Sequence, residues 1–339
     1  MVGVRADLGD SGIVVAPMAG GPTTTGSVIA AARGGAVGFL AAGYKQPSAV
    51  SDEIAEVRAA RVRYGLNIFV PTPPPANLAP LERYRESLKP EADRYDVRLP
   101  PLRPDDDDHF AAKIEIAVAA GVPLVSFAFG VPDPAAVRAL RAAGSTVLIT
   151  VTSAAEARDA MAAGPDMLIA QGGSAGGHAS TTRPAAYRGD TTALDVLRDV
   201  AAVADVPVIA AGGTGTAGDV RALLGAGAVA VQCGTLFLLA EEAGTRPAQR
   251  AAMLSGRYGP TVVTRAFTGH PARALPNRFT AAHSAGAPVG YPAIHHLTAP
   301  IRAAAAAQGD AEALNLWAGT AHAAARPGTT AEIIDRLTR

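Results

Sequence analysis

Eight short apolar runs, each followed by a stretch with helical features, limit most strongly what this chain can fold into. The runs cover residues 13–15, 37–40, 66–70, 123–127, 146–150, 167–170, 207–210 and 228–231. They are continuously apolar rather than alternating, which is typical of parallel strands that helices bury on both faces. Eight strand–helix repeats predict an α/β fold, a (β/α)8 TIM barrel.

The segments between the runs carry the start and stop signals of helices. Ser153 with Glu156 three residues later has the pattern of a capping box, and Gly164 is expected to end that helix. Asp133 followed by a proline predicts the start of a second helix. The first run lacks the GxGxxG that opens a doubly wound dinucleotide-binding fold, so the barrel is the more economical interpretation.

Charge balance and cysteine content argue against several classes of protein. The chain has 30 basic and 30 acidic residues and no basic run with interleaved aromatics, so we expect no nucleic-acid or membrane partner. Cys233 is the only cysteine, which excludes an internal disulfide and a multi-cysteine metal site. We expect no metal.

The polar residues 1–10 lack the apolar core of a signal peptide, and no apolar run reaches roughly 18 residues, so we expect a cytoplasmic protein.

Two segments interrupt the repeat. Residues 71–108 are rich in proline and charge, and they predict an insertion after the third strand with a helix over 81–88. Its acidic run, 105–108, is expected to be the solvated N-terminus of the next helix. We assign residues 1–240 to the barrel core. Residues 241–339, with Ala-rich helices and a His/Tyr/Pro loop at 291–296, form a C-terminal helical extension packed on the barrel in the same domain. This extension also offers a surface for a homodimer.

Two loops rich in glycine and polar residues predict a phosphate site. They contain Gly212 and Gly213 after the seventh run, and Gln232, Cys233, Gly234 and Thr235 after the eighth. Barrels often bind phosphate at the loops after these two strands. Glycine lets backbone N–H groups approach phosphate oxygens closely. The alternative is that the glycines only turn tight corners. The pattern indicates a phosphorylated ligand without identifying it.

A histidine on a glycine loop follows the sixth run. His178 comes directly after Gly176 and Gly177, and the ordinary histidine pKa near 6.5 suits proton transfer at neutral pH. We predict that it is an acid/base group, with a purely structural histidine as the alternative. Asn67 and Gln171 each offer an amide donor and acceptor to the edge of a heteroaromatic ring, or else satisfy buried backbone groups.

The loop after the first run completes a recognisable pattern. It places small residues and backbone amides where a cofactor ring would lie, although Met18 could equally fill the core. The stretches that match a known family are 16–24, 38–45, 67–69, 175–178, 210–213 and 232–235, with 271–273 and 291–292 in the tail. On these motifs the chain resembles the nitronate monooxygenases, formerly called 2-nitropropane dioxygenases, over nearly its whole length. Residues 175–178 and the two downstream loops are the most specific part.

The resemblance implies an FMN-dependent enzyme that oxidises alkyl nitronates with O2 to a carbonyl compound and nitrite. It implies FMN contacts from Ala16, Met18, Gly20, Asn67, Gln171, Gly176, Gly177, Gly212, Gly213, Gln232, Cys233, Gly234 and Thr235. His178 would remove a proton from a neutral nitroalkane, or as imidazolium stabilise the nitronate anion. The candidate substrate-side groups are Tyr44, Lys45, Tyr291, His295 and His296. Ser174 stands where the family carries a glutamate, which removes a carboxylate from the surroundings of His178.

Three other functions share parts of the pattern. An FMN-dependent enoyl-thioester reductase of the enoyl-acyl-carrier-protein type has the same barrel and Gly-Gly-His loop, and would consume NAD(P)H. A nucleotide dehydrogenase resembling inosine-monophosphate dehydrogenase needs a cysteine nucleophile in a flexible loop, whereas Cys233 lies at the end of the eighth run. A flavin-binding sensor without catalysis is supported only by Ser174 and Ala128, and His178 argues against it.

Overall fold

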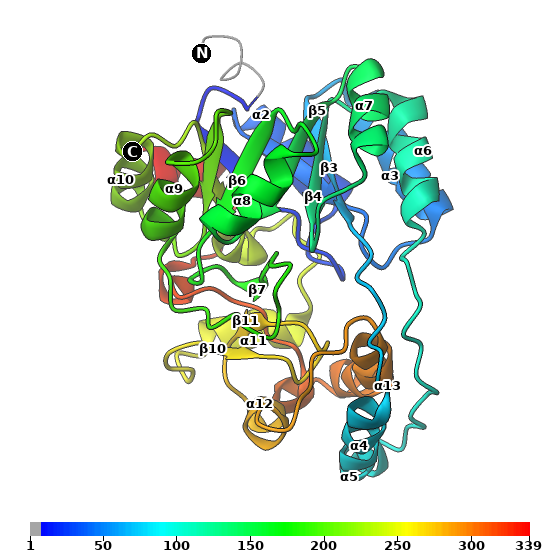
Figure 1. Ribbon diagram of the computed structural model, residues 1–339. Helices are drawn as coiled ribbons and strands as arrows, with labels where there is room; N and C mark the ends of the chain where they lie inside the picture. The colour runs from blue at the N-terminus through cyan, green and yellow to red at the C-terminus, as the bar shows by residue number, and fades with distance from the viewer. Residues whose placement is uncertain (1–7) are drawn as a thin grey trace.

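The computed structural model describes residues 8–339 and contains a closed barrel of eight parallel strands (Figure 1). Its strands are β1 (Ile13–Val15), β2 (Val37–Ala41), β3 (Tyr64–Phe69), β4 (Leu124–Ala128), β5 (Thr146–Val151), β6 (Met167–Gln171), β8 (Val208–Ala211) and β9 (Val231–Cys233). Strands adjacent in this order pair with each other, and β9 pairs with β1. The predicted (β/α)8 barrel is therefore confirmed.

Seven of the eight predicted runs coincide closely with strands, and the eighth is displaced. We expected a strand over 228–231, but β9 begins at Val231. Residues 228–230 instead lead from the preceding turn into the strand, after Gly227 with a left-handed φ of 104°. As a result Gln232 and Cys233, expected in the loop, belong to the strand itself.

Every residue of strands such as β2 and β3 is buried, because helices cover the outside of the barrel. The first seven positions of this ring are filled by α2 (Thr25–Arg33), α3 (Pro47–Ala59), α6 (Phe110–Ala120), α7 (Pro134–Ala142), α8 (Ala154–Met161), α9 (Ala193–Ala201) and α10 (Ala217–Gly225). The last helix of the chain, α14 (Thr330–Thr338), packs between α10 and α2. Its buried Ile333, Ile334 and Leu337 join the main core, so the C-terminus completes the ring.

Between β9 and α14 the chain makes a long excursion that starts and ends at one place, where Ala240 and Gly328 form a bridge. The excursion contains η1 (Thr235–Leu239), α11 (Pro247–Leu254), β10 (Val262–Thr264), β11 (Ala272–Ala274), α12 (Arg278–His283), α13 (Ala293–Ala307), η2 (Ala311–Ala313) and η3 (His322–Ala324). The predicted helical extension is present, and it also contains β10 and β11, which form a small sheet with β7 (Gly177–His178). These strands are too short to show a periodic pattern. The division of the chain at residue 240 stays a prediction.

The insertion after β3 forms α4 (Ala79–Ser87) and α5 (Lys89–Arg94), close to the predicted helix. It shares a second hydrophobic core with the excursion, built from residues such as Leu81, Tyr84, Phe267 and Ile294. In Figure 1 these elements form a layer beneath the barrel. The second core explains how a segment rich in charge and proline stays packed against the molecule.

Two expectations about polar segments were only partly correct. The acidic run is not simply a solvated helix N-terminus, because Asp108 pairs at 2.8 Å with the fully buried Lys113, and Asp106 lies 2.8 Å from His296. These contacts anchor the run to neighbouring elements. The loop expected at 291–296 is only partly a loop, since α13 begins at Ala293 and carries His295 and His296.

No helix in residues 8–339 combines the length and apolar character needed to cross a membrane. Nor do these residues contain a cluster of three or more His, Cys, Asp or Glu side chains able to hold a metal ion. Of the segment on which the signal-peptide expectation was based, residues 1–7 lie outside the described part.

Candidate active site

A cavity of about 480 Å³ opens at the C-terminal ends of the barrel strands. Its lining includes residues at or near those ends, such as Asn67, Ala128, Gln171, Ala211 and Cys233. Small-molecule sites in proteins typically span about 300–1,000 Å³, and barrels carry theirs at this face. All the predicted cofactor-side residues and His178 line this one cavity.

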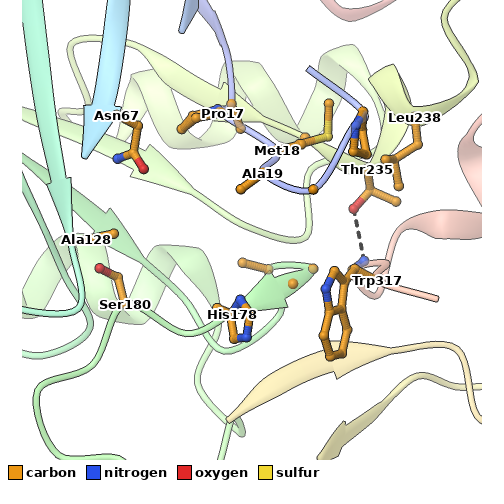
Figure 2. Close-up of a pocket in the computed structure, with 18 of the residues that line it drawn as sticks. Pro17, Met18, Ala19, Asn67, Ala128, His178, Ser180, Thr235, Leu238 and Trp317 are labelled. Carbon is orange, nitrogen blue, oxygen red and sulfur yellow. Dashed lines mark hydrogen bonds between the residues drawn. The ribbon is translucent and has the colours of Figure 1, made fainter. Parts of the chain in front are cut away.

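The loop after β1 lies across the cavity from His178. In Figure 2, Pro17, Met18 and Ala19 occupy one side, and His178 and Trp317 the other. Thr23 closes this loop, since the Met18 N–H donates to its hydroxyl at 2.8 Å and its own N–H donates to the Met18 carbonyl at 3.2 Å. A flat ring could therefore be held between the loop and His178.

The loop after β8 requires glycine. Gly213 has a left-handed φ of 70°, and a Cβ there would meet the Ser174 hydroxyl at 2.6 Å. Gly212 has a φ of 111°, and its Cβ would lie 2.9 Å from the backbone nitrogen of Ala175. Only glycine lets the backbone adopt these conformations in so little space.

The cavity lining contains buried polar atoms without a partner in residues 8–339. The buried Gln232 Oε1 and Asn315 Oδ1 have no hydrogen-bond partner among the described residues, and both residues line the cavity. Buried polar groups are normally hydrogen-bonded, so the lining fits a bound group with polar atoms. The N–H groups of Gly215 and Thr216 already donate to Asp219, so these two donors are not free to bind a ligand.

Two neighbours hold His178 at the cavity wall. β7 pairs with β11, which places His178 opposite Ala272. The Gln171 amide bonds to the same loop from the other side, donating to the His178 carbonyl at 3.1 Å and accepting from the Ser180 N–H at 2.6 Å. Gln171 therefore satisfies backbone groups, the alternative left open from the sequence, and its contact with a cofactor stays a prediction.

The imidazole of His178 is neutral at neutral pH. Burial, reinforced by His270 and the positive charge of Arg302, lowers its pKa well below 6.5. Its Nε2 lies 2.9 Å from the Thr268 hydroxyl. A neutral ring can accept a proton but supplies no positive charge, so this protonation state fits the base role rather than the imidazolium role.

The substrate-side candidates separate into three groups. Tyr44 and His295 line the cavity and stack on each other, with ring centroids 4.1 Å apart. Tyr291 does not line the cavity, although its ring lies 6.1 Å from that of His178. The structure does not bring Lys45 or His296 to the cavity, because Lys45 pairs with Glu53 of α3 at 2.6 Å and His296 faces Asp106. The left-handed backbone at Tyr44 reverses the chain between Tyr44 and Lys45.

Sequence reasoning missed several residues that the fold brings to the cavity. Trp317, the chain's single tryptophan, lies with its ring 5.3 Å from that of His178. Arg302 and Arg246 also line the cavity. The one local signal was an arginine on the buried face of the Ala-rich helix α13. Trp317 and Arg246 lie in irregular segments that carry no motif.

Cys233 is unsuited to nucleophilic chemistry. It is buried, and burial raises the pKa of its thiol to about 12. A thiol that stays protonated at neutral pH is a poor nucleophile. This agrees with the argument against a dehydrogenase that uses a cysteine nucleophile.

Comparisons with known proteins agree with one another. The family model described as nitronate monooxygenase matches residues 8–339. A protein of Staphylococcus aureus (strain Newman) named "Probable nitronate monooxygenase" is 33% identical over 311 residues, which cover 91% of this chain and 87% of that protein. The crystal structure of nitroalkane oxidase from Streptomyces ansochromogenes superposes with a TM-score of 0.93 at 41% identity, covering 98% of this chain and 96% of the other.

FabK from Thermotoga maritima shares only the fold, with a TM-score of 0.76 at 24% identity over 98% of this chain and 94% of its own. The match to the family model and the identity to the two other proteins show the family as well as the fold. They agree with the glycine loops and the half-buried histidine around the cavity. The chain therefore belongs to the nitronate monooxygenase family and is a flavin-dependent oxidoreductase.

Proposed function

We propose that this enzyme holds FMN in the barrel cavity and oxidises an alkyl nitronate with O2 to a carbonyl compound and nitrite. The observation that carries the proposal is that a neutral, half-buried His178 lines the same cavity as the two glycine loops. The relatives of this chain named probable nitronate monooxygenase and nitroalkane oxidase also support an alkyl nitronate as the substrate.

The cavity fits a phosphorylated ring cofactor. Backbone groups of Gly212, Gly213, Gly234 and Thr235 would hold the phosphate, and the unpartnered Gln232 would meet polar atoms of the cofactor. Residues 16–20 would lie along the ring, opposite His178 (Figure 2). FMN supplies the redox chemistry when bound, and the protein supplies orientation and electrostatics.

Proton transfer falls to one atom of His178. The Thr268 hydroxyl donates to the His270 carbonyl at 3.3 Å, so it is available to accept from His178 Nε2–H at 2.9 Å. That tautomer leaves Nδ1 of His178 unprotonated. We propose that Nδ1 removes the α-proton when a neutral nitroalkane binds. A preformed nitronate needs no such step.

The first test is a purification followed by two assays. We expect a yellow protein that releases FMN on denaturation, consumes O2 with alkyl nitronates, and forms nitrite. A colourless protein that does not bind added FMN would refute the cofactor proposal. Rapid anaerobic bleaching of the flavin by NADH, without nitrite formation from any nitronate, would favour the enoyl-thioester reductase instead. The homodimer stays a prediction, which light scattering on the purified enzyme would test.

A further inference from the structure

A buried cation without an acidic partner lies in the wall of the cavity. Arg302 of α13 is only 6% exposed and lines the cavity. Its guanidinium donates to the Thr298 hydroxyl at 3.1 Å and to the His295 carbonyl at 2.8 Å. Both acceptors are neutral. In the described part of the chain no carboxylate forms an ion pair with Arg302 or is among the groups that shift its pKa.

Arg302 carries its charge at neutral pH. Burial lowers its pKa only to about 10. The other titratable groups around it are Tyr44, His178, His295 and His296, with a second cation, Arg246. Burial raises the pKa of Tyr44 and lowers the pKa of each of these histidines, so none of them adds a negative charge. A buried charge is costly unless it is paired, so this arrangement favours an anion in the cavity.

The position of Arg302 indicates at which end of the cavity the anion would bind. Arg302 donates to the His295 carbonyl, and the ring of Tyr291 lies 6.3 Å from that of His295 and 6.1 Å from that of His178. Arg302 and His178 therefore lie in the same part of the cavity wall. Tyr44 and His295, the neighbours of Arg302, come from the loop after β2 and from α13. The phosphate loops follow β8 and β9. Arg302 therefore faces the acid/base end of the cavity rather than the proposed phosphate end.

We propose that Arg302 binds the nitro oxygens of the substrate and makes the site prefer the nitronate anion over the neutral nitroalkane. The inference depends on the function proposed above and adds a division of labour to it. His178 is neutral and handles the proton, whereas Arg302 holds the negative charge. An arginine fork matches two oxygens on one planar nitrogen in the same way that it matches a carboxylate.

The test compares three variants of the flavin-loaded enzyme: Arg302→Met, Arg302→Lys and, as a control, Arg198→Met. Arg198 is exposed on α9, so its replacement changes the net charge equally but far from the cavity. Sodium nitrate, a planar unreactive anion, is titrated at constant ionic strength while the flavin absorbance reports its Kd. The KM is then measured for an alkyl nitronate and for the corresponding neutral nitroalkane.

We expect Arg302→Met to retain FMN, and to raise the nitrate Kd and the nitronate KM about tenfold or more. The KM for the neutral nitroalkane should change less than about threefold, because a neutral ligand gains little from the charge. Arg302→Lys should recover part of the loss, and Arg198→Met should behave like the wild type.

Equal losses for the anionic and the neutral substrate, or an unchanged nitrate Kd, would overturn the assignment. So would loss of FMN from both Arg302 variants, because Arg302 would then pair with the cofactor instead. Nitrate binding that depends on Arg302, in a wild-type enzyme that oxidises no nitronate, would keep the anion site and refute the proposed reaction.

Discussion

Glu156 offers the sharpest test of how the His178 loop is held. Its carboxylate is 2% exposed. One oxygen accepts from the Thr152 N–H at 2.7 Å and the Thr152 hydroxyl at 2.8 Å. The other accepts from the Thr181 hydroxyl at 2.6 Å, and from the N–H and hydroxyl of Thr182 at 2.9 and 3.2 Å. The predicted capping box is only half formed, because Ser153 caps Glu156 but the carboxylate serves these other donors.

We predict that Glu156→Gln lowers the free energy of unfolding by about 2–4 kcal/mol. The amide replaces one acceptor oxygen by a donor that faces donors. Whichever way it turns, the N–H of Thr152 or of Thr182 loses its acceptor, which costs about 1–3 kcal/mol, and the remaining bonds lose their charge assistance. At about 2.1 cal/mol/K per residue, the unfolding entropy of 339 residues is about 0.7 kcal/mol/K. The expected fall in Tm is therefore about 3–6 °C.

Differential scanning calorimetry at pH 7 measures this shift directly. Glu115→Gln is the matched control, since Glu115 is exposed on α6 and its replacement should change stability by less than about 0.5 kcal/mol. If Glu156→Gln melts within about 1 °C of this control, the carboxylate does not hold the loop as argued.

Three further predictions concern His178, the loop after β8 and the neighbouring His270. His178→Asn should keep the flavin but slow turnover of a neutral nitroalkane by about 100-fold or more relative to a preformed nitronate; equal losses on both substrates would argue against the base role. Gly213→Asp should abolish flavin retention, because it strains a φ of 70° and places a carboxylate against the phosphate; a normally flavinated variant would contradict the phosphate site. Burial lowers the pKa of His270 to about 4, so below pH 6.5 the unfolded chain takes up a proton that the folded chain does not. The stability contributed by neutral His270 is thus complete above pH 6.5 and is lost as the pH falls toward 4, by up to about 3 kcal/mol. Urea unfolding at pH 7 and pH 5 should show the decline in the wild type and a smaller one in His270→Gln; equal declines would refute this origin.

Local sequence patterns were sufficient for the barrel and for much of its cavity. Continuous apolar runs report burial on both faces, and a strand buried on both faces belongs to a parallel sheet covered by helices. Once eight such strands are placed, the residues that follow them converge at one end of the barrel. This is why Gly213 and His178, far apart in the chain, could be assigned to one cavity before any contact was known.

Contacts between residues far apart in the sequence could not be predicted from local patterns, because they depend on tertiary packing. β7 exists because it pairs with β11, almost a hundred residues later, and the excursion brings Arg302 and Trp317 to the cavity. The same packing turns Lys45 away to Glu53 while Tyr44 faces inward. A periodic pattern records which face of one element is buried, but it holds no information about which distant element buries it. The sequence alone therefore determined the barrel and the edge that carries the cavity, whereas the arginine and tryptophan side chains in the cavity wall depend on how the second core docks against that edge.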